Sequence, residues 1–331
     1  MTELSYRPFP YGWFQVSYSH ELEVGEARPV HYFDEEMVLF RGDDGLPKLV
    51  EAYCPHMGAH LGHGVHSTLE DGTCARGKVS GNRIVCPFHG WEFNGDGYCE
   101  SVPYATKMPP TAVGQQLLKT WPLCERNGTI WMWYHPAGQP PKWEVESFAE
   151  LDPQNELWSE FETYRWTIKT HCQEMAENGA DPAHFFFVHG VADAPLSTQD
   201  FDRGPRREGV IEAPLDTPRG RVEGRIAYIT QGPGLAVTRF TGLCETIELG
   251  NVTPIDKNTV ELNYAFSQQM EDGKKTGGGI AAAIIRDIVK QTNEDIVIWE
   301  HKIYRDKPLL CDGDGPIAKF RKWYSQFYYE G

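Results

Sequence analysis

Short runs of apolar and β-branched residues alternate with turn-forming residues over the first 135 positions or so. The runs have the length and composition of strands, and the segments between them are rich in the glycine, asparagine and aspartate that tight turns require. This alternation predicts an all-β domain built from hairpins. The predicted strands are RPVHYF, EMVLFR, PKLVEAY, RIVCPF and TIWMWYH, separated by RGDDG, SGN, NGDG and RNG.

A second domain is expected after residues 135–143, HPAGQPPKW, where proline and glycine are concentrated. We place residues 1–138 in the first domain and residues 139–331 in the second. Strand-like stretches return beyond the boundary, and two helical stretches lie near residues 171–188 and 280–304. The fold class is therefore predicted to be α+β, with an antiparallel sheet and a few helices in the second half.

The bulk composition excludes several classes of function. A chain of 331 residues with a formal net charge of −16 has no general affinity for nucleic acids or anionic membranes, which bind basic surfaces. No apolar run is long enough to span a bilayer, and the first residues lack the pattern of a secretion or transit signal, so we expect a cytoplasmic protein. The 8 cysteines are too sparse for a disulfide framework and favour metal binding or buried thiols.

Two predicted loops combine cysteine with histidine, each after a strand-like run. The first contains Cys54 and His56 in CPH, and the second contains Cys86 and His89 in CPFHGW. Two such loops could hold a [2Fe–2S] cluster, with the cysteines on one iron and the histidines on the other. A zinc site is one alternative, but it prefers a cysteine pair followed by a histidine pair on a helix. The other alternative is four residues that bind no metal.

These residues resemble the ligand motif of Rieske proteins, Cys-x-His followed by Cys-x-x-His. Residues 57–85 separate the two halves, and their length resembles an insertion relative to the family. Respiratory-type Rieske proteins carry extra cysteines and a serine where this chain has Ala59, Phe88 and Trp91. The resemblance therefore implies a lower-potential cluster that donates electrons to another redox centre. We interpret the other metal-binding residue types of the insertion as solvated loop residues: His60, His63, His66 and Cys74.

An acceptor for such electrons is suggested by ENGADPAHFFFVHG, residues 177–190. His184 and His189 are five positions apart, so they face one metal only if the helix ends or distorts between them, and Gly190 provides a stop. Two histidines and one carboxylate form the ligand set of non-haem iron(II) oxygenases. The alternative is that both histidines are satisfied core residues and that Asp181 only caps a helix.

The third ligand is expected on the helical stretch 280–304. Asp295 lies on the predicted apolar stripe of that helix, and a buried carboxylate must be paired or coordinated. Glu294 lies off the stripe and is interpreted as a solvated charge, and Glu174 or Glu177 would be the next candidates. The stripe consists of Ile284, Ile288, Thr292, Ile298 and Trp299.

With this second motif, the resemblance to the catalytic components of Rieske oxygenases covers nearly the whole chain. It implies an N-terminal Rieske β-domain and a helix-grip catalytic domain, with Fe²⁺ held by His184, His189 and Asp295. By position, Asn178 matches a side chain near the iron, and Asp181 matches a residue that bridges a cluster histidine to an iron-bound histidine. The family also implies a head-to-tail homotrimer, O₂ as co-substrate, and electrons from NAD(P)H through a ferredoxin-type or flavin/iron–sulfur reductase.

Two further stretches, NGDGYCESVPYATKMPP and the tail PLLCDGDGPIAKFRKWYSQFYYE, resemble 3-ketosteroid 9α-hydroxylase oxygenase components and related sterol desaturases. This implies a monooxygenase that hydroxylates an apolar polycyclic substrate, a steroid, and the apolar residues 185–188 beside the iron motif predict an apolar pocket. Alternatives with the same metals are an O- or N-demethylase, a desaturase and an aromatic ring-hydroxylating oxygenase. A Rieske electron-transfer protein is the alternative from another class.

Overall fold

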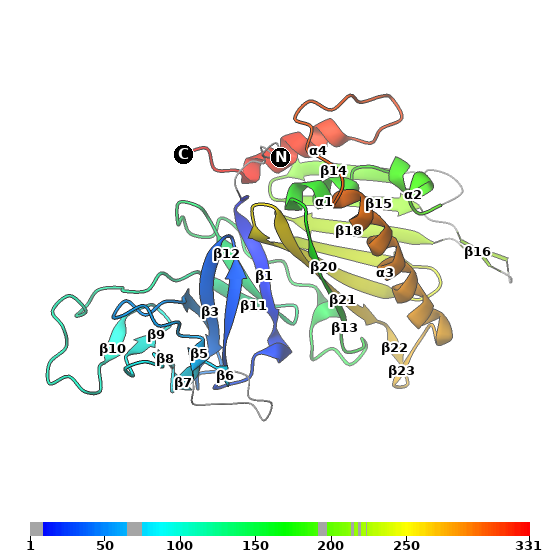
Figure 1. Ribbon diagram of the computed structural model, residues 1–331. Coiled ribbons are helices and arrows are strands. Elements are labelled where there is room, and N and C mark those ends of the chain that lie inside the picture. Colours follow the sequence, from blue (N-terminus) through cyan, green and yellow to red (C-terminus); the bar gives the residue numbers. More distant parts are fainter. Residues whose placement is uncertain (1–8, 65–74, 191–196, 213–214, 218–219, 223) are drawn as a thin grey trace. The chain divides into compact units, whose positions relative to one another are not determined.

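The computed structural model divides the chain into two compact units (Figure 1). One unit is Val16–Tyr134, and the other consists of Met1–Gln15 with His135–Gly331. Among the described residues, no helix is both long and apolar enough to cross a membrane. The structure describes residues 9–64, 75–190, 197–212, 215–217, 220–222 and 224–331.

The Val16–Tyr134 unit consists of small antiparallel sheets, in agreement with the predicted hairpins. Its core lies between strands that follow one another at short intervals: Val38, Val50, Ile84 and Phe93 are all fully buried in one cluster. Residues 37–40 around Val38 are all fully buried, so the core covers both faces of that strand. Cys54 and Cys86 belong to the same buried cluster, so the core fixes the loops that carry them.

The strands of this unit form the sheets β1-β12-β11, β2-β3-β4, β10-β9-β8-β7 and β5-β6. Their bounds are β1 (Gly12–Tyr18, which begins in the other unit), β2 (Ala27–Tyr32), β3 (Glu35–Arg41), β4 (Pro47–Glu51), β5 (His63–Gly64), β6 (Ala75–Arg76), β7 (Lys78–Ser80), β8 (Arg83–Val85), β9 (Glu92–Asn94), β10 (Cys99–Ser101), β11 (Leu123–Arg126) and β12 (Thr129–Tyr134).

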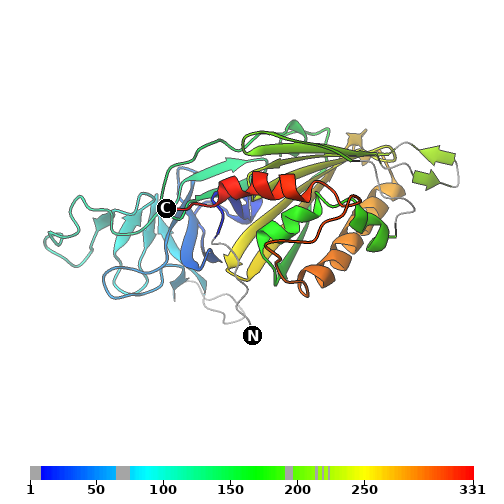
Figure 2. The same ribbon diagram turned by 90° about the horizontal axis from the view of Figure 1, so that it is seen from above.

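The other unit is built on one seven-stranded antiparallel sheet with the order β13-β21-β20-β19-β18-β15-β14. Helices α1 and α3 lie on the same face of this sheet (Figure 2). They are held there by a buried cluster that joins Met175 of α1 and Trp299 of α3 to Ile168, Val260 and Leu262 of strands β13 and β21. Burial of this shared apolar surface fixes the two helices that carry Asn178 and Asp295.

The strands of this unit are β13 (Glu162–Ile168), β14 (Ser197–Arg203), β15 (Arg206–Glu212), β16 (Leu215–Thr217), β17 (Gly220–Val222), β18 (Arg225–Gln231), β19 (Leu235–Thr241), β20 (Thr246–Asp256), β21 (Thr259–Gln268), β22 (Met270–Glu271) and β23 (Lys274–Lys275). The α-helices are α1 (Cys172–Asn178), α2 (Ala183–Phe187), α3 (Gly279–Trp299) and α4 (Ile317–Tyr324), and short 3₁₀ turns occupy Ser19–Glu21, Ala149–Leu151 and Ser325–Phe327.

The helices differ from the sequence prediction in two respects. The expected helix near residues 171–188 is two short helices, because α1 ends at Asn178 and α2 begins only at Ala183. The apolar stripe expected on α3 is partly wrong, since the Ile298 side chain is exposed. The stripe also omitted two fully buried positions, Ala281 and Ile285, the latter one residue away from the predicted Ile284.

Candidate metal centres

The two Cys/His loops of the Val16–Tyr134 unit have the same backbone hydrogen bonds. In the first loop, Gly58 N–H donates to the Cys54 carbonyl at 2.9 Å, and Cys54 N–H donates to the carbonyl of Ala59 at 2.9 Å. In the second, Gly90 N–H donates to the Cys86 carbonyl at 3.0 Å, and Cys86 N–H donates to the Trp91 carbonyl. Both glycines have a positive φ, of 74° and 73°, which a residue with a Cβ rarely adopts. The two loops are therefore tight turns with the same backbone hydrogen bonds and the same glycine conformation.

The four predicted cluster ligands come together between these loops. The Cys54 and Cys86 thiols are hydrogen-bonded to each other, which raises the pKa of Cys54 and lowers the pKa of Cys86. The rings of His56 and His89 lie 4.9 Å apart, and each has a buried Nδ1 with no hydrogen-bond partner among the described residues. Buried polar atoms of folded proteins are nearly always paired. Two adjoining thiols with two unpaired imidazole nitrogens fit a [2Fe–2S] cluster.

Side chains around the loops enclose this position. The His56 ring stacks on Trp91 with 4.7 Å between centroids, and Trp91 Nε1 donates to the Tyr104 hydroxyl at 2.9 Å. Pro103, which follows β10, packs against Gly90: a Cβ at that glycine would lie 3.0 Å from the proline ring. Of the other candidates in the insertion, the rings of His60 and His63 lie 4.4 Å apart on the protein surface, whereas His66 and Cys74 fall outside the described residues.

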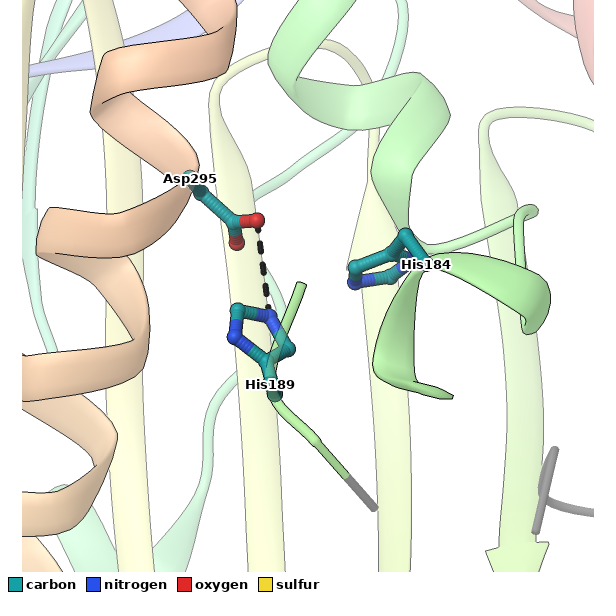
Figure 3. Close-up of side chains that lie close together, drawn as sticks. All are labelled: His184, His189 and Asp295. Atoms are coloured by element: carbon teal, nitrogen blue, oxygen red, sulfur yellow. Dashed lines mark ion pairs between the residues drawn. The ribbon is translucent and has the colours of Figure 1, made fainter. Parts of the chain in front are cut away.

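The second centre brings together His184, His189 and Asp295 (Figure 3). Their ligand atoms all lie within 4.8 Å of one another, and among the described residues this is the one group of three or more metal-binding side chains that meets this distance. His189 Nε2 lies 3.4 Å from Asp295 Oδ1, and the side chains are 2% and 14% exposed. A buried carboxylate beside two imidazoles is a donor set that suits Fe²⁺ with open positions.

The end of a helix brings the two histidines together. Helix α2 carries His184 near its start and ends at Phe187, so His189 lies beyond it and is not held to the helical spacing. Gly190 follows with φ +68°, a conformation that favours glycine and turns the chain away. Asp295 comes from a separate element, α3, about one turn before the end of that helix, where neighbouring Ile296 packs on the buried cluster.

Hydrogen-bond acceptors face the Nδ1 atoms of both histidines. The main-chain carbonyl of Asp181 faces His184 Nδ1 in a short contact, and Glu294 Oε2 lies 3.0 Å from His189 Nδ1. Both partners can only accept, so each Nδ1 carries the proton and each Nε2 is free to bind a metal. The hydrogen bond with His189 lowers the pKa of Glu294. The interpretation of Glu294 as a solvated charge is therefore wrong: helical periodicity cannot reveal a partner supplied by the segment that follows α2.

Two further polar residues, Asn178 and Asp181, lie beside the two histidines and Asp295 and make different contacts. Asn178 Nδ2 donates to Asp295 Oδ2 at 3.0 Å and lies 3.4 Å from His184 Nε2. Burial raises the pKa of Asp295, while the two nearby imidazoles oppose that rise. The Asp181 carboxylate accepts a hydrogen bond from Ala183 N–H at 3.1 Å. It therefore binds the first N–H of α2 from the residue before the N-cap, which is Pro182, whereas its main-chain oxygen contacts the histidine.

The two alternative carboxylates on α1 are engaged elsewhere. Glu174 forms an ion pair with Lys302 at 2.5 Å, and Glu177 makes two hydrogen bonds with Arg321 at 2.8 and 2.9 Å. Neither belongs to the group formed by the histidines and Asp295. Asp295 thus remains the carboxylate that the fold presents to both histidines.

A cavity of about 290 Å³ opens beside this group, and its wall includes Asn178, His184, His189 and Asp295. The predicted source of its apolar lining is largely wrong. Phe185 lines the cavity, but Phe186 and Phe187 are exposed, the latter by 81%. The apolar wall comes mainly from the sheet and α3, with Ile211, Ile226, Leu235, Val252, Leu262 and Ile288.

Two family models match this chain. A family model described as the Rieske [2Fe-2S] domain matches residues 12–122, and one described as the 3-ketosteroid 9alpha-hydroxylase C-terminal domain matches residues 132–328. The second match alone covers more than half of the chain. The chain belongs to the Rieske non-haem iron oxygenases. As the oxygenase component of such a monooxygenase, it is an enzyme that uses a [2Fe–2S] cluster, a mononuclear iron, O₂ and electrons from a reductase or ferredoxin partner.

Curated relatives of this Rieske oxygenase act on steroids, to judge by their names. A probable 3-ketosteroid-9-alpha-monooxygenase, oxygenase component, from Rhodococcus rhodochrous is 30% identical, over 96% of this chain and 79% of that protein. Cholesterol 7-desaturase nvd 1 from Ciona intestinalis is also 30% identical, over 97% of this chain and 69% of that protein. The crystal structure of dicamba monooxygenase bound to dicamba has the same fold, with a TM-score of 0.70 at 17% identity and 96% coverage of both chains.

Proposed function

We propose that this Rieske oxygenase hydroxylates an apolar polycyclic substrate, a steroid, in the manner of a 3-ketosteroid 9α-hydroxylase. The observation that carries this proposal is the position of His184, His189 and Asp295 in the wall of a cavity whose lining is mostly apolar. Such a cavity binds a hydrocarbon framework through the hydrophobic effect and presents it to the metal site. The relatives named above support the choice of a steroid.

In this proposal each residue is assigned a role from the metal-binding atoms that it offers. Cys54, His56, Cys86 and His89 would hold the [2Fe–2S] cluster, and His184, His189 and Asp295 would hold the Fe²⁺. When bound, these groups supply electron transfer and O₂ activation. The chain itself fixes the tautomer of each histidine through the acceptors at Nδ1, and the cavity excludes water from the substrate. Asn178 orients the Asp295 carboxylate through its hydrogen bond.

Three finer expectations from the sequence remain predictions of the same proposal. The catalytic domain is of the helix-grip type, which the long helix α3 on a seven-stranded antiparallel sheet supports. The chain assembles as a head-to-tail homotrimer in which Asp181 lies between His184 and a neighbour's His89. In support, Asp181 Oδ1 is used by the helix cap, whereas Oδ2 has no hydrogen bond within the described chain. The location is cytoplasmic.

Desaturation is the second candidate, because one of the relatives is named a cholesterol 7-desaturase. Purified holoenzyme with a surrogate reductase, NADH and O₂ would be incubated with androst-4-ene-3,17-dione and with cholesterol. Hydroxylation adds one oxygen atom to the product mass, and desaturation removes two hydrogen atoms. Oxygen uptake without either product, or turnover of small aryl ethers alone, would contradict the steroid assignment and leave the enzyme class intact.

A further inference from the structure

One strong positive charge lies inside the unit that carries the cavity. Arg207 is on β15, where side chains alternate between the two faces, and it faces inward together with Ile211. It is 3% exposed and lines the same cavity as His184 and Asp295. Its Nε and Nη1 atoms are buried without a hydrogen-bond partner among the described residues. Buried guanidinium groups normally bond to carboxylates or carbonyl oxygens.

The groups that do surround Arg207 are aromatic. Its guanidinium carbon lies 5.0 Å from the centroid of Phe320, 5.2 Å from that of Tyr228, and 5.7 Å from those of Phe201 and Trp323. Ring faces attract a cation, but they accept none of its N–H bonds in the plane of the guanidinium. Burial lowers the pKa of Arg207, and no carboxylate of the described chain acts against that shift. An arginine nevertheless keeps its proton in proteins.

A glycine of the main chain lies against this guanidinium. A Cβ at Gly179 would lie 2.9 Å from Arg207 Nη2, which is closer than ordinary contact. Gly179 has φ −66° and ψ −8°, a right-handed conformation that any residue adopts, so its backbone does not require glycine. The absence of a side chain at Gly179 therefore leaves room for the guanidinium itself. Because Gly179 follows Asn178 directly, the guanidinium lies on the side of the cavity nearest α1.

We propose that Arg207 binds a carboxylate at one end of the apolar substrate, so that the enzyme acts on a steroid acid in preference to a neutral steroid. This rests on the proposed function, because it assumes that the cavity of His184, His189 and Asp295 is the substrate site. A planar guanidinium matches the two oxygens of a carboxylate with two parallel hydrogen bonds. The aromatic rings hold the guanidinium in one place, and the apolar wall accepts the rest of the molecule.

A structural role is the competing explanation. Arg207 contacts rings on α4, β14 and β18, so it could simply hold α4 against the sheet. The two explanations differ in what they predict for a neutral side chain of similar length. If Arg207 only holds α4 in place, the variant protein would be less stable and would bind every ligand more weakly by the same factor. If Arg207 instead binds the substrate carboxylate, the variant would lose only its preference for the acid. Its ligand-free stability would change little, because the charge that is removed is buried and unpaired.

The experiment compares two probes of the same framework in the purified holoenzyme: 3-oxochol-4-en-24-oic acid and its methyl ester. Dissociation constants are measured by calorimetry for the wild type, for Arg207→Met, and for Arg206→Gln. Arg206 is the matched control, since it neighbours Arg207 on β15, pairs with Glu146 and Glu208, and does not line the cavity. Thermal midpoints of the ligand-free variants are measured in parallel.

We expect the wild type and Arg206→Gln to bind the acid more tightly than the ester. Arg207→Met should weaken the acid about 10- to 100-fold and leave the ester within a factor of about two, as the loss of hydrogen bonds to a charged group predicts. Its ligand-free thermal midpoint should be unchanged or higher. An acid-to-ester ratio that is the same in the wild type and Arg207→Met would overturn the proposal, whatever the variant does to stability.

A second probe pair, biphenyl-4-carboxylate and its methyl ester, distinguishes a failure of the steroid assignment from a failure of the carboxylate site at Arg207. If neither steroid probe binds the wild type but the biphenyl acid does so through Arg207, the steroid is wrong and the carboxylate site stands. If the steroid ester binds as well as its acid, the steroid stands and the carboxylate site is wrong. If no acid in either pair binds better than its ester, the proposal for Arg207 fails.

Discussion

The Nδ1 atom of His189 lies 3.0 Å from Oε2 of Glu294. A carboxylate in this position holds the ring in one orientation and keeps the proton on Nδ1, which directs Nε2 toward the metal position. Glu294 lies directly before Asp295 on α3, so one helix supplies a proposed ligand and the partner of another. This pairing leads to the first prediction.

Glu294→Gln should weaken the hold on the mononuclear iron by about 10- to 100-fold, because an amide is a poorer acceptor for the imidazole N–H than a carboxylate is. Iron released to a chelator over time measures this, and the visible spectrum of the cluster should not change. The control is Asp287→Asn on the exposed face of the same helix, where the side chain accepts a hydrogen bond from Gln291. Equal iron retention in both variants would show that Glu294 has no such role.

Asp295→Ala should remove the mononuclear iron and all substrate oxidation, because a methyl group cannot hold Fe²⁺. Iron analysis should fall to the two irons of the cluster, with the cluster spectrum intact. Glu174→Gln is the matched control on the neighbouring helix, since that carboxylate pairs with Lys302 away from the group. A fully active Asp295→Ala enzyme would refute the ligand assignment.

The proposed electron path runs from the cluster of one subunit to the iron of its neighbour through Asp181, and it can be tested with mixed trimers. One variant would carry a damaged cluster, Cys86→Ser, and the other a damaged iron site, His184→Ala, and each alone should be inactive. Coexpressed, the two should form mixed trimers that regain part of the activity, because an intact cluster then faces an intact iron across a subunit boundary. Mixed assemblies that form but stay inactive would rule out the path.

Asp181→Asn tests the residue itself. The asparagine still caps α2, so stability should fall by less than about 1 kcal/mol, while oxidation should nearly stop and both metal centres should remain. The capping bond seen here, from Ala183 N–H to Oδ1, is the interaction that asparagine retains. Normal turnover in this variant would mean that Asp181 acts only as a cap.

Glu248 on β20 predicts an unusual pH dependence of stability. Burial raises the pKa of Glu248 to about 8, so the folded state keeps its proton at pH values where the unfolded chain has lost it. Stability from this group is therefore present below the unfolded pKa of about 4.3 and declines as the pH rises toward about 8.

Glutamine does not titrate, so Glu248→Gln should raise the free energy of unfolding by roughly 5 kcal/mol at pH 9 and change it little at pH 4.5. Thermal midpoints of the ligand-free variants across this range measure the difference, with the exposed Glu271→Gln as the control. A gain that is the same at both pH values would mean that the carboxyl is ionised in the folded protein.

The elements predicted from the sequence were those in which a local pattern agrees with the final packing. Strands such as β3 and β12 are continuous apolar runs, and α3 is a long helix without breakers. Strand β20 was not predicted, because Gly250 and Pro254 interrupt its pattern while its pairing with β19 and β21 overrides their preferences. Helix α4 was missed although its four buried residues recur at helical spacings, because eight residues are only about two turns and give a short periodic pattern.

The candidate sites show the same division. The residue types and spacing around His184 were sufficient to suggest a metal site, and a break between the two histidines was required by helical geometry. The contacts of Glu294 and Arg207 are made with elements that are distant in the chain, so no local sequence pattern predicts them. The cavity wall could not be predicted from the flanking phenylalanines either, because exposure of Phe187 is decided by where α2 ends.

The positions of the two donor sets along the chain have a consequence for biosynthesis. All four proposed cluster residues precede residue 90, and they lie in a unit that is complete at Tyr134. The other set cannot form until Asp295 has left the ribosome, and the core around it closes only when α3 packs on the sheet. Because domains fold as units during synthesis, the nascent chain can accept its cluster first. A truncated chain released early would be coloured but catalytically inert.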